Sequence, residues 1–254
     1  TVDFAVQPGN SNVVLLGSEE TVGNRPAIYR SVDGGVQWTA VYTLARPWGR
    51  NGGYALAFDP QATDRVYAVT GSSSPATATE NDVLRSEDAG LSWTVVLTSS
   101  GAHPGLDIVE VAGDSTVYVA GRDWWQGLGS GGLVYRSIDQ GDSWTSVYTA
   151  GSNIIGLAID PQRAATLYII DDANRLFKST DAGDNWTNIY TATHTLKALA
   201  HDTSVSGHLY LGTDGPTVLA SSDGGQTWSE LTDWAGSVAP EMSSLVVDLS
   251  LIHI

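Results

Sequence analysis

The stretch Ser137-Ile138-Asp139-Gln140-Gly141-Asp142-Ser143-Trp144 decides the fold, because it recurs four more times in a chain of 254 residues. Each copy follows the pattern Ser-x-Asp-x-Gly-x-x-Trp, and the other copies span residues 31–38, 86–93, 179–186 and 221–228. A pattern repeated in this way indicates a repeated structural unit, which constrains the architecture more strongly than local propensity does.

The residue types in the pattern predict a tight hairpin turn with an aromatic side chain beneath it. A short Asp side chain accepts backbone N–H bonds, Gly adopts a backbone angle closed to other residues, and Ser adds a second local hydrogen bond. Trp covers a large apolar area and keeps one N–H for a partner. We therefore expect a structural role for the repeated residues Asp33, Asp88, Asp139, Asp181, Asp223, Trp38, Trp93, Trp144, Trp186 and Trp228.

This pattern resembles the Asp-box, or BNR repeat, which joins the third and fourth strands of a β-propeller blade. That family includes sialidases, xyloglucan-degrading glycosidases, sortilin-type receptors and photosystem-assembly propellers. The resemblance covers nearly the whole chain and implies an all-β propeller of four-stranded antiparallel blades. It says less about activity, because one fold hosts many functions.

Short apolar runs before each box predict a buried first strand in every repeat. With a second strand, a third that leads into the box and a fourth after the Trp, each repeat forms one blade. We expect a single domain over residues 1–254, with blades at about 1–44, 53–99, 106–150, 154–192 and 196–234 and a partial blade at 243–254. The chain would then be most of a ring of about six to eight blades, and a closed five-bladed ring is the alternative.

Composition and charge exclude several classes of function. The chain has 28 acidic and 12 basic residues and a formal net charge of −16, so its surface repels phosphate backbones and no nucleic-acid partner is expected. It has no Cys, which excludes disulfides and thiolate chemistry. No apolar run approaches the ~20 residues of a membrane span. No metal-ligand spacing or phosphate-binding motif is present, so neither a metal nor a cofactor is expected.

The connections between strands are uneven in length. In a blade of alternating strands, the box turns lie at one end, and the joins from second to third strand lie at the other. The long joins belong to the first three repeats, at residues 17–26, 71–82 and 121–132, and the joins between blades at 44–53 and 99–105 are also extended. Binding groups often lie on loops held by a rigid framework. We therefore expect any site on this long-loop face of blades 1–3.

Two of these segments contain candidate binding groups. Trp124 and Trp125 stand beside Arg122 and Asp123, and flat aromatic rings stack on sugars while polar neighbours bind hydroxyls. The alternative is that one Trp packs into a neighbouring blade. A second segment holds candidates for binding a carboxylate or a sugar, unless it is an ordinary ordered loop. Its candidate residues are Arg46, Trp48, Arg50 and Tyr54.

The third candidate is a set of carboxylates that includes Glu110. The equivalent residues of the other first strands are small or aliphatic: Ala5, Ala57, Ala158, Ala200 and Val246. A buried charge there requires a partner. Burial would raise the pKa of Glu110 and suit it to act as a general acid, with Asp107 or Asp123 as the second carboxylate. The alternative is an ion pair with a basic side chain, because residues 107 and 110 should point to opposite faces of a strand.

Several repeated or isolated basic residues favour scaffold roles. Arg30, Arg85, Arg136 and Lys178 each precede a box, and a feature shared by most repeats belongs to the framework. His201 fills a position held elsewhere by Phe58 and Ile159, which favours a core His.

Two functions fit these features. The first is a secreted or periplasmic, glycan-associated propeller that is glycoside-hydrolase-like or carbohydrate-binding. It departs from sialidases, because Arg25-Pro26 is not their Arg-Ile-Pro segment and no Arg triad can be assigned. The alternative is a non-catalytic propeller whose same loops bind a protein. Open blade edges would also permit self-association.

Overall fold

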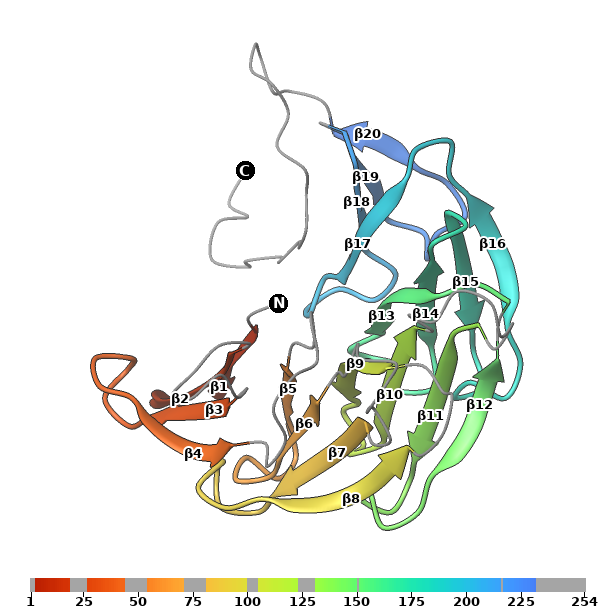
Figure 1. Ribbon diagram of the computed structural model, residues 1–254. Coiled ribbons are helices and arrows are strands. Elements are labelled where there is room, and N and C mark those ends of the chain that lie inside the picture. Colours follow the sequence, from red (N-terminus) through yellow and green to blue (C-terminus); the bar gives the residue numbers. More distant parts are fainter. Residues whose placement is uncertain are drawn as a thin grey trace. The chain divides into compact units, whose positions relative to one another are not determined.

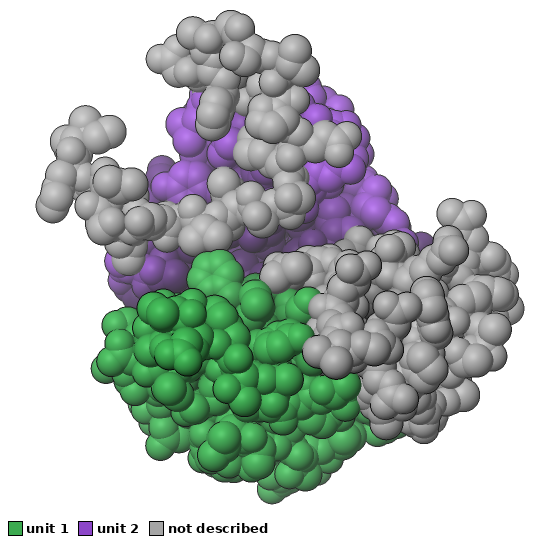
Figure 2. Space-filling view, turned by 60° about the vertical axis from the view of Figure 1, so that its left-hand side comes forward, with its two compact units in different colours: residues 1–149 green, residues 150–254 purple. Residues whose placement is uncertain are grey.

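The chain consists of short antiparallel sheets joined in sequence order (Figure 1). The computed structural model describes residues 3–18, 27–43, 54–70, 81–99, 105–122, 131–149, 151–215 and 217–231. Within these ranges every regular element is a β-strand, in five four-stranded sheets. The predicted all-β architecture is confirmed. The chain divides into two compact units, residues 1–149 and 150–254 (Figure 2).

The first unit holds three sheets of four consecutive strands. The first sheet contains β1 (Asp3–Gln7), β2 (Asn10–Ser18), β3 (Ala27–Ser31) and β4 (Thr39–Thr43). The second contains β5 (Tyr54–Phe58), β6 (Val66–Thr70), β7 (Asn81–Ser86) and β8 (Thr94–Ser99). The third contains β9 (Gly105–Val111), β10 (Val117–Arg122), β11 (Leu133–Ser137) and β12 (Thr145–Thr149).

The second unit holds two sheets of the same design. The fourth sheet contains β13 (Ile154–Ile159), β14 (Leu167–Asp171), β15 (Arg175–Ser179) and β16 (Thr187–Thr191). The fifth contains β17 (Leu196–His201), β18 (Leu209–Thr213), β19 (Val218–Ser221) and β20 (Ser229–Leu231). The partial repeat expected at 243–254 lies outside the described residues.

Within each unit the sheets pack through apolar faces. The first strands lie side by side, β1 with β5 and β5 with β9 in the first unit, and β13 with β17 in the second. The second strands β6 and β14 are buried along their whole length. Leu15 of the first sheet and Val66 of the second belong to one core cluster, and Tyr67 and Val109 join the second sheet to the third. Burial on both faces explains why these strands read as continuous apolar runs.

The hairpin between the third and fourth strands has the same hydrogen bonds in all five sheets. In the third sheet, Ser137 Oγ donates to Asp139 Oδ1 (2.8 Å) and accepts from Gly141 N (2.7 Å). Asp139 Oδ1 also accepts from Ser143 N (2.8 Å), and Trp144 Nε1 donates to the carbonyl of Gly141 (3.0 Å). Equivalent bonds occur in the copies at 31–38, 86–93, 179–186 and 221–228.

The bonds to the repeated Asp fix its charge as well as its position. The hydroxyl and N–H of Ser143, followed by the hydroxyl of Ser137, lower the pKa of Asp139 to about 2. The carboxylate is therefore an acceptor for the turn throughout the neutral range. Gly141 has φ of 93°, a left-handed angle that favours Gly.

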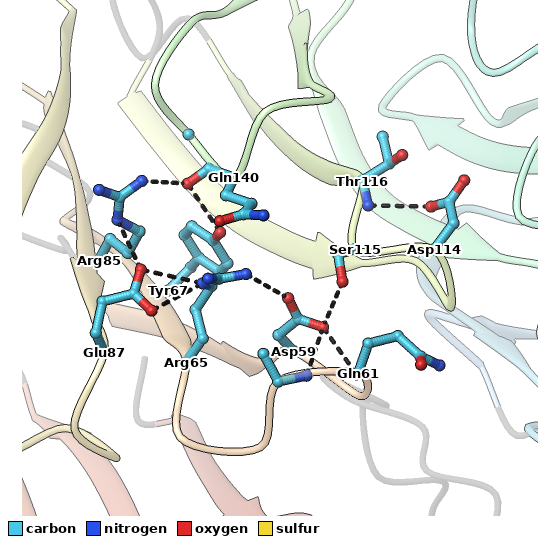
Figure 3. Close-up of polar contacts among 12 residues, drawn as sticks. Asp59, Gln61, Arg65, Tyr67, Arg85, Glu87, Asp114, Ser115, Thr116 and Gln140 are labelled. Atoms are coloured by element: carbon cyan, nitrogen blue, oxygen red, sulfur yellow. Dashed lines mark hydrogen bonds and ion pairs between the residues drawn. The ribbon is translucent and has the colours of Figure 1, made fainter.

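Cations ahead of the boxes link neighbouring sheets at this end. Arg30 Nε donates to the carbonyl of Ala89 (2.8 Å), and Arg85 Nη1 donates to the carbonyl of Gln140 (2.6 Å). The hydroxyl of Tyr67 donates to the same Gln140 carbonyl at 2.9 Å (Figure 3). These basic residues therefore belong to the framework of the first unit.

Candidate functional site

The strand ends that lead into the long connections lie at the end of each sheet opposite the box turns. In the third sheet, Val117 pairs with Ser137 beside the box, whereas Gly121 pairs with Leu133 at the other end. The same antiparallel order holds in the first two sheets, where Ser18 pairs with Ala27 and the β6–β7 ladder ends at Thr70. The framework thus separates the box turns from the strand ends of the candidate site.

The predicted aromatic and basic candidates fall mostly on the connections. Tyr54 begins β5 and pairs with Thr70, and Arg122 ends β10 and pairs with Gly105, so both backbones lie at the long-connection end. The other candidates on these segments lie outside the described residues: Arg46, Trp48, Arg50, Asp123, Trp124 and Trp125. Their proposed roles stay predictions.

Glu110 occupies the position that the repeat alignment gives it. It pairs with Tyr118 in the third sheet, just as Ala57 pairs with Tyr67 in the second. The side chain is partly buried on the innermost strand. Burial raises the pKa of Glu110 to about 7, and the negative charge of Asp3 adds to this increase. A carboxyl that titrates near neutrality can hold and release a proton at physiological pH.

Asp107 lies at an irregularity of the same strand. Leu106 pairs with Gly121 and Ile108 pairs with Ala120, so Asp107 is the extra residue of a bulge. A bulge redirects the side chain of its extra residue and bends the strand locally. The first strands of the fourth and fifth sheets have the same shift, at Ile155 and Lys197. The third, fourth and fifth sheets thus share an irregular position near the start of the first strand, and it holds chemically different side chains.

Asp3 is the carboxylate that sequence reasoning missed. Its Oδ2 accepts from Leu56 N of β5 and its Oδ1 from Phe4 N, both at 2.9 Å. Burial raises its pKa, and these two N–H groups partly oppose the increase. In the pairing register Asp3 stands where the next two sheets have Ala55 and Ile108. A charge in a position that is otherwise small or apolar was the available signal.

Asp3 and Glu110 give the first unit two perturbed carboxyls on its innermost strands. The negative charge of Asp3 disfavours ionisation of Glu110, so Glu110 keeps its proton to a higher pH than burial alone would cause. Among the described residues no group of three or more His, Cys, Asp or Glu side chains is placed to hold a metal. The described part of the chain also contains no helix long and apolar enough to cross a bilayer.

Comparison with known proteins gives sequence and structural relatives. The Sortilin-Vps10 family model (sortilin, neurotensin receptor 3) matches residues 132–243. A xyloglucanase from a Paenibacillus species is 31% identical over 134 residues, which is 44% of this chain and 12% of that protein. The chain therefore spans only a small part of that relative.

Solved structures share the fold over most of the chain. The GH74 xyloglucanase from Xanthomonas campestris has a TM-score of 0.67 and 22% identity, covering 88% of this chain and 36% of that one. YCF48 bound to a D1 peptide has a TM-score of 0.59 and 15% identity, covering 91% of this chain and 66% of that one. Both contain this fold within a longer chain.

The repeated turns, the five sheets and these relatives show that the chain is a β-propeller of the Asp-box type. The resemblance predicted from the boxes is confirmed. Within that class the chain is similar to the propellers of glycoside hydrolases, in sequence to the Paenibacillus xyloglucanase and in fold to the GH74 enzyme.

Proposed function

We propose that this chain is a glycan-associated propeller that binds a xyloglucan-like polysaccharide at the long-connection end of its first three sheets. The observation that carries the proposal is the 31% identity with a xyloglucanase over 134 residues. A β-glucan chain offers flat sugar faces and many hydroxyls, and both match the candidate side chains on these connections. A secreted or periplasmic location fits such a polymer.

In this proposal Glu110 is the general acid. It pairs with Tyr118, one residue from the box end of the β10–β11 ladder, so a bound sugar would have to reach along the innermost strand to meet it. With a pKa of about 7 it keeps its proton at mildly acidic pH, and it would donate that proton to the leaving glycosidic oxygen. Asp107 or Asp123 would be the second carboxylate, which either attacks the sugar ring as a nucleophile or removes a proton from the attacking water. Asp3 is a positioning residue, since its negative charge favours the protonated form of Glu110.

The aromatic and basic candidates would bind the sugar. Trp124 and Trp125 would stack on pyranose faces, and Arg122 would bind the hydroxyls beside them. The segment that holds Arg46, Trp48, Arg50 and Tyr54 would bind the adjoining sugars. Binding and hydrolysis therefore depend on different residues, which makes them separable by substitution.

The second candidate function is that of a protein-binding propeller. It is favoured by the YCF48 structure, which contains a bound D1 peptide, and by the match to the sortilin model. The same strand ends would then present their connections to a peptide. No proton transfer would be required of Glu110.

The test combines binding and hydrolysis with xyloglucan oligosaccharides as the probe. Calorimetric titration should show binding by the parent, loss in Trp124→Ala/Trp125→Ala, and retention in the control Trp124→Phe/Trp125→Phe, which keeps flat rings. Glu110→Gln should retain binding and lose release of reducing ends, whereas Glu230→Gln, an exposed residue of β20, should retain both. Absence of binding to xyloglucan and to a glycan array would reject the proposal and leave the protein-binding function.

A further inference from the structure

His201 is a buried titratable group that the proposed function does not use. It ends β17 and its side chain is 4% exposed, at the position held by Phe58 in the second sheet. Its Nδ1 lies 2.7 Å from the carbonyl oxygen of Asp202. A carbonyl only accepts hydrogen bonds, so Nδ1 carries a hydrogen. The second ring nitrogen, Nε2, is buried and makes no hydrogen bond with the residues that the structure describes.

Nε2 of His201 faces a buried carboxylate of the neighbouring sheet. It lies 3.7 Å from Oδ2 of Asp160, which follows β13 and has a side chain 1% exposed. Asp160 Oδ1 accepts from Gln162 N (3.0 Å), and Oδ2 accepts from the hydroxyl of Ser206 in the fifth sheet (2.6 Å). Burial acts to raise the pKa of Asp160, but the bonds from Ser206 and Gln162 and the nearby His201 lower it overall. The carboxylate is therefore negative.

The second sheet shows how the same carboxylate position is neutralised elsewhere. Asp59 N donates to the carbonyl of Arg65, and Asp160 N donates to the carbonyl of Thr166, both at 2.9 Å, so the two turns are equivalent. Asp59 is also buried, and a hydroxyl of the next sheet, that of Ser115, donates to it at 2.9 Å. Arg65 Nη1 lies 3.3 Å from Asp59 Oδ2 (Figure 3). The second sheet thus has a permanent cation where the fourth has the neutral Thr166.

A buried carboxylate without a nearby positive charge is costly, because it has lost its hydration. In the fourth sheet Arg163 acts on Asp160 electrostatically, and the buried ring of His201, 3.7 Å away, is placed to add a second positive charge. A neutral ring with its hydrogen on Nδ1 would turn a lone pair toward Asp160 Oδ2. A second proton on Nε2 replaces that repulsion with a charge-assisted hydrogen bond.

We propose that His201 and Asp160 form a proton-dependent link between the fourth and fifth sheets. In acid, Nε2–H of the imidazolium donates to Asp160 Oδ2 and joins the sheets. As the pH rises, the ring loses this proton and the link is broken. The favourable contribution to stability is therefore present at low pH and lost at high pH, across the range in which His changes charge.

Four other titratable groups lie around this pair: Tyr168, Lys178, Arg163 and His208. The ring of Tyr168 lies 6.0 Å from the imidazole, and burial raises the pKa of Tyr168 to about 12, so it stays neutral. Lys178 Nζ lies 5.3 Å from the Tyr168 ring centroid. Arg163 acts electrostatically on Asp160, whereas His208 acts on the carboxylate of Asp202.

The first experiment measures melting temperatures at about pH 5.5 and about pH 8.5, on either side of the range in which His titrates. His201→Phe puts the residue of the second sheet into the same position and removes the second proton. We expect the melting temperature of the parent minus that of His201→Phe to be roughly 2 to 4 °C larger at about pH 5.5 than at about pH 8.5. His194→Phe, an exposed position of the same unit, should show no such dependence. An equal difference at both pH values would overturn the proposal.

The second experiment needs no variant to fold. NMR of the ¹⁵N-labelled imidazoles in the native protein reports which ring nitrogens carry hydrogen. We expect the imidazole of His201 to carry hydrogen on both nitrogens in acid and to lose only the Nε2 proton in base. Asp160→Asn keeps an oxygen that can accept from Gln162 N, and it should abolish the pH dependence of the difference in melting temperature that His201→Phe causes. An Nε2 of His201 that stays unprotonated at about pH 5.5 would refute the link.

Discussion

Replacing Glu110 with Gln should stabilise the protein in base and leave its stability unchanged in acid. Burial, assisted by the charge of Asp3, raises the pKa of Glu110 from 4.5 to about 7. The unfolded chain therefore releases this proton at lower pH than the folded chain, so the free energy of unfolding falls as pH rises through this interval. At about 1.4 kcal/mol per pH unit, the full difference is about 3 kcal/mol, an upper value because the side chain is only partly buried.

The assay is urea unfolding of the parent and Glu110→Gln, followed by Trp fluorescence at several pH values from about 4 to about 8. The stability difference should be near zero at the acid end, grow through the interval and level off above neutrality. Asp3→Asn in the parent background should move this interval to lower pH, because it removes the negative charge that favours protonated Glu110. Glu230→Gln, an exposed Glu on β20, should show no such profile. A Glu110→Gln difference that stays constant with pH would refute the reasoning.

Two further predictions concern the turns. Ser137→Ala should destabilise the protein by about 2 kcal/mol in thermal unfolding, because it leaves the buried N–H of Gly141 without its acceptor. Ser143→Ala in the same turn should have a smaller effect. Equal effects of the two substitutions would contradict the assigned role of the buried Ser137 hydroxyl. Gly90→Ala should lower the melting temperature strongly, because Gly90 has φ of 84° and an added Cβ would lie 2.5 Å from a Leu15 methyl. In the control Gly113→Ala the added Cβ meets no atom within 4 Å, so its melting temperature should stay close to that of the parent. A Gly90→Ala protein as stable as the parent would show that the turn adapts.

The framework was predictable because its information is local and repeated. The pattern around Ser137 and Trp144 needs only eight residues to define a turn, and each copy reports on the others. The position of Glu110 could also be predicted, because an alignment of the first strands places this one charged residue at a position where most other repeats have Ala. Both inferences use sequence spacing alone, and the pairing register places Glu110 as the alignment did.

Contacts between sheets were much harder to predict. Asp3 was overlooked because no rule for a single strand relates it to Glu110, two sheets away along the chain. The pairing of His201 with Asp160 likewise joins residues that share neither a strand nor a turn. The alignment suggested a core His, and the ring is indeed buried, but its charged neighbour came only from the packing of one sheet on the next. The bulge at Asp107 is similarly invisible in a pattern of alternating residues.

The contrast between the box turns and the innermost strands explains how this fold tolerates an unfavourable acid. In the box turns each repeated Asp and Ser makes hydrogen bonds, and Arg85 and Tyr67 donate to the next sheet. The hydrogen bonds within the box are repeated in all five sheets, so the framework does not depend on any one innermost strand. A group with a raised pKa such as Glu110 lowers stability above neutrality. Groups that reduce stability in this way are found where function requires them, with the loss offset elsewhere in the structure. This is the physical reason for placing the proposed chemistry at Glu110 and not at the Asp residues of the boxes, whose hydrogen bonds lower their pKa and keep them ionised.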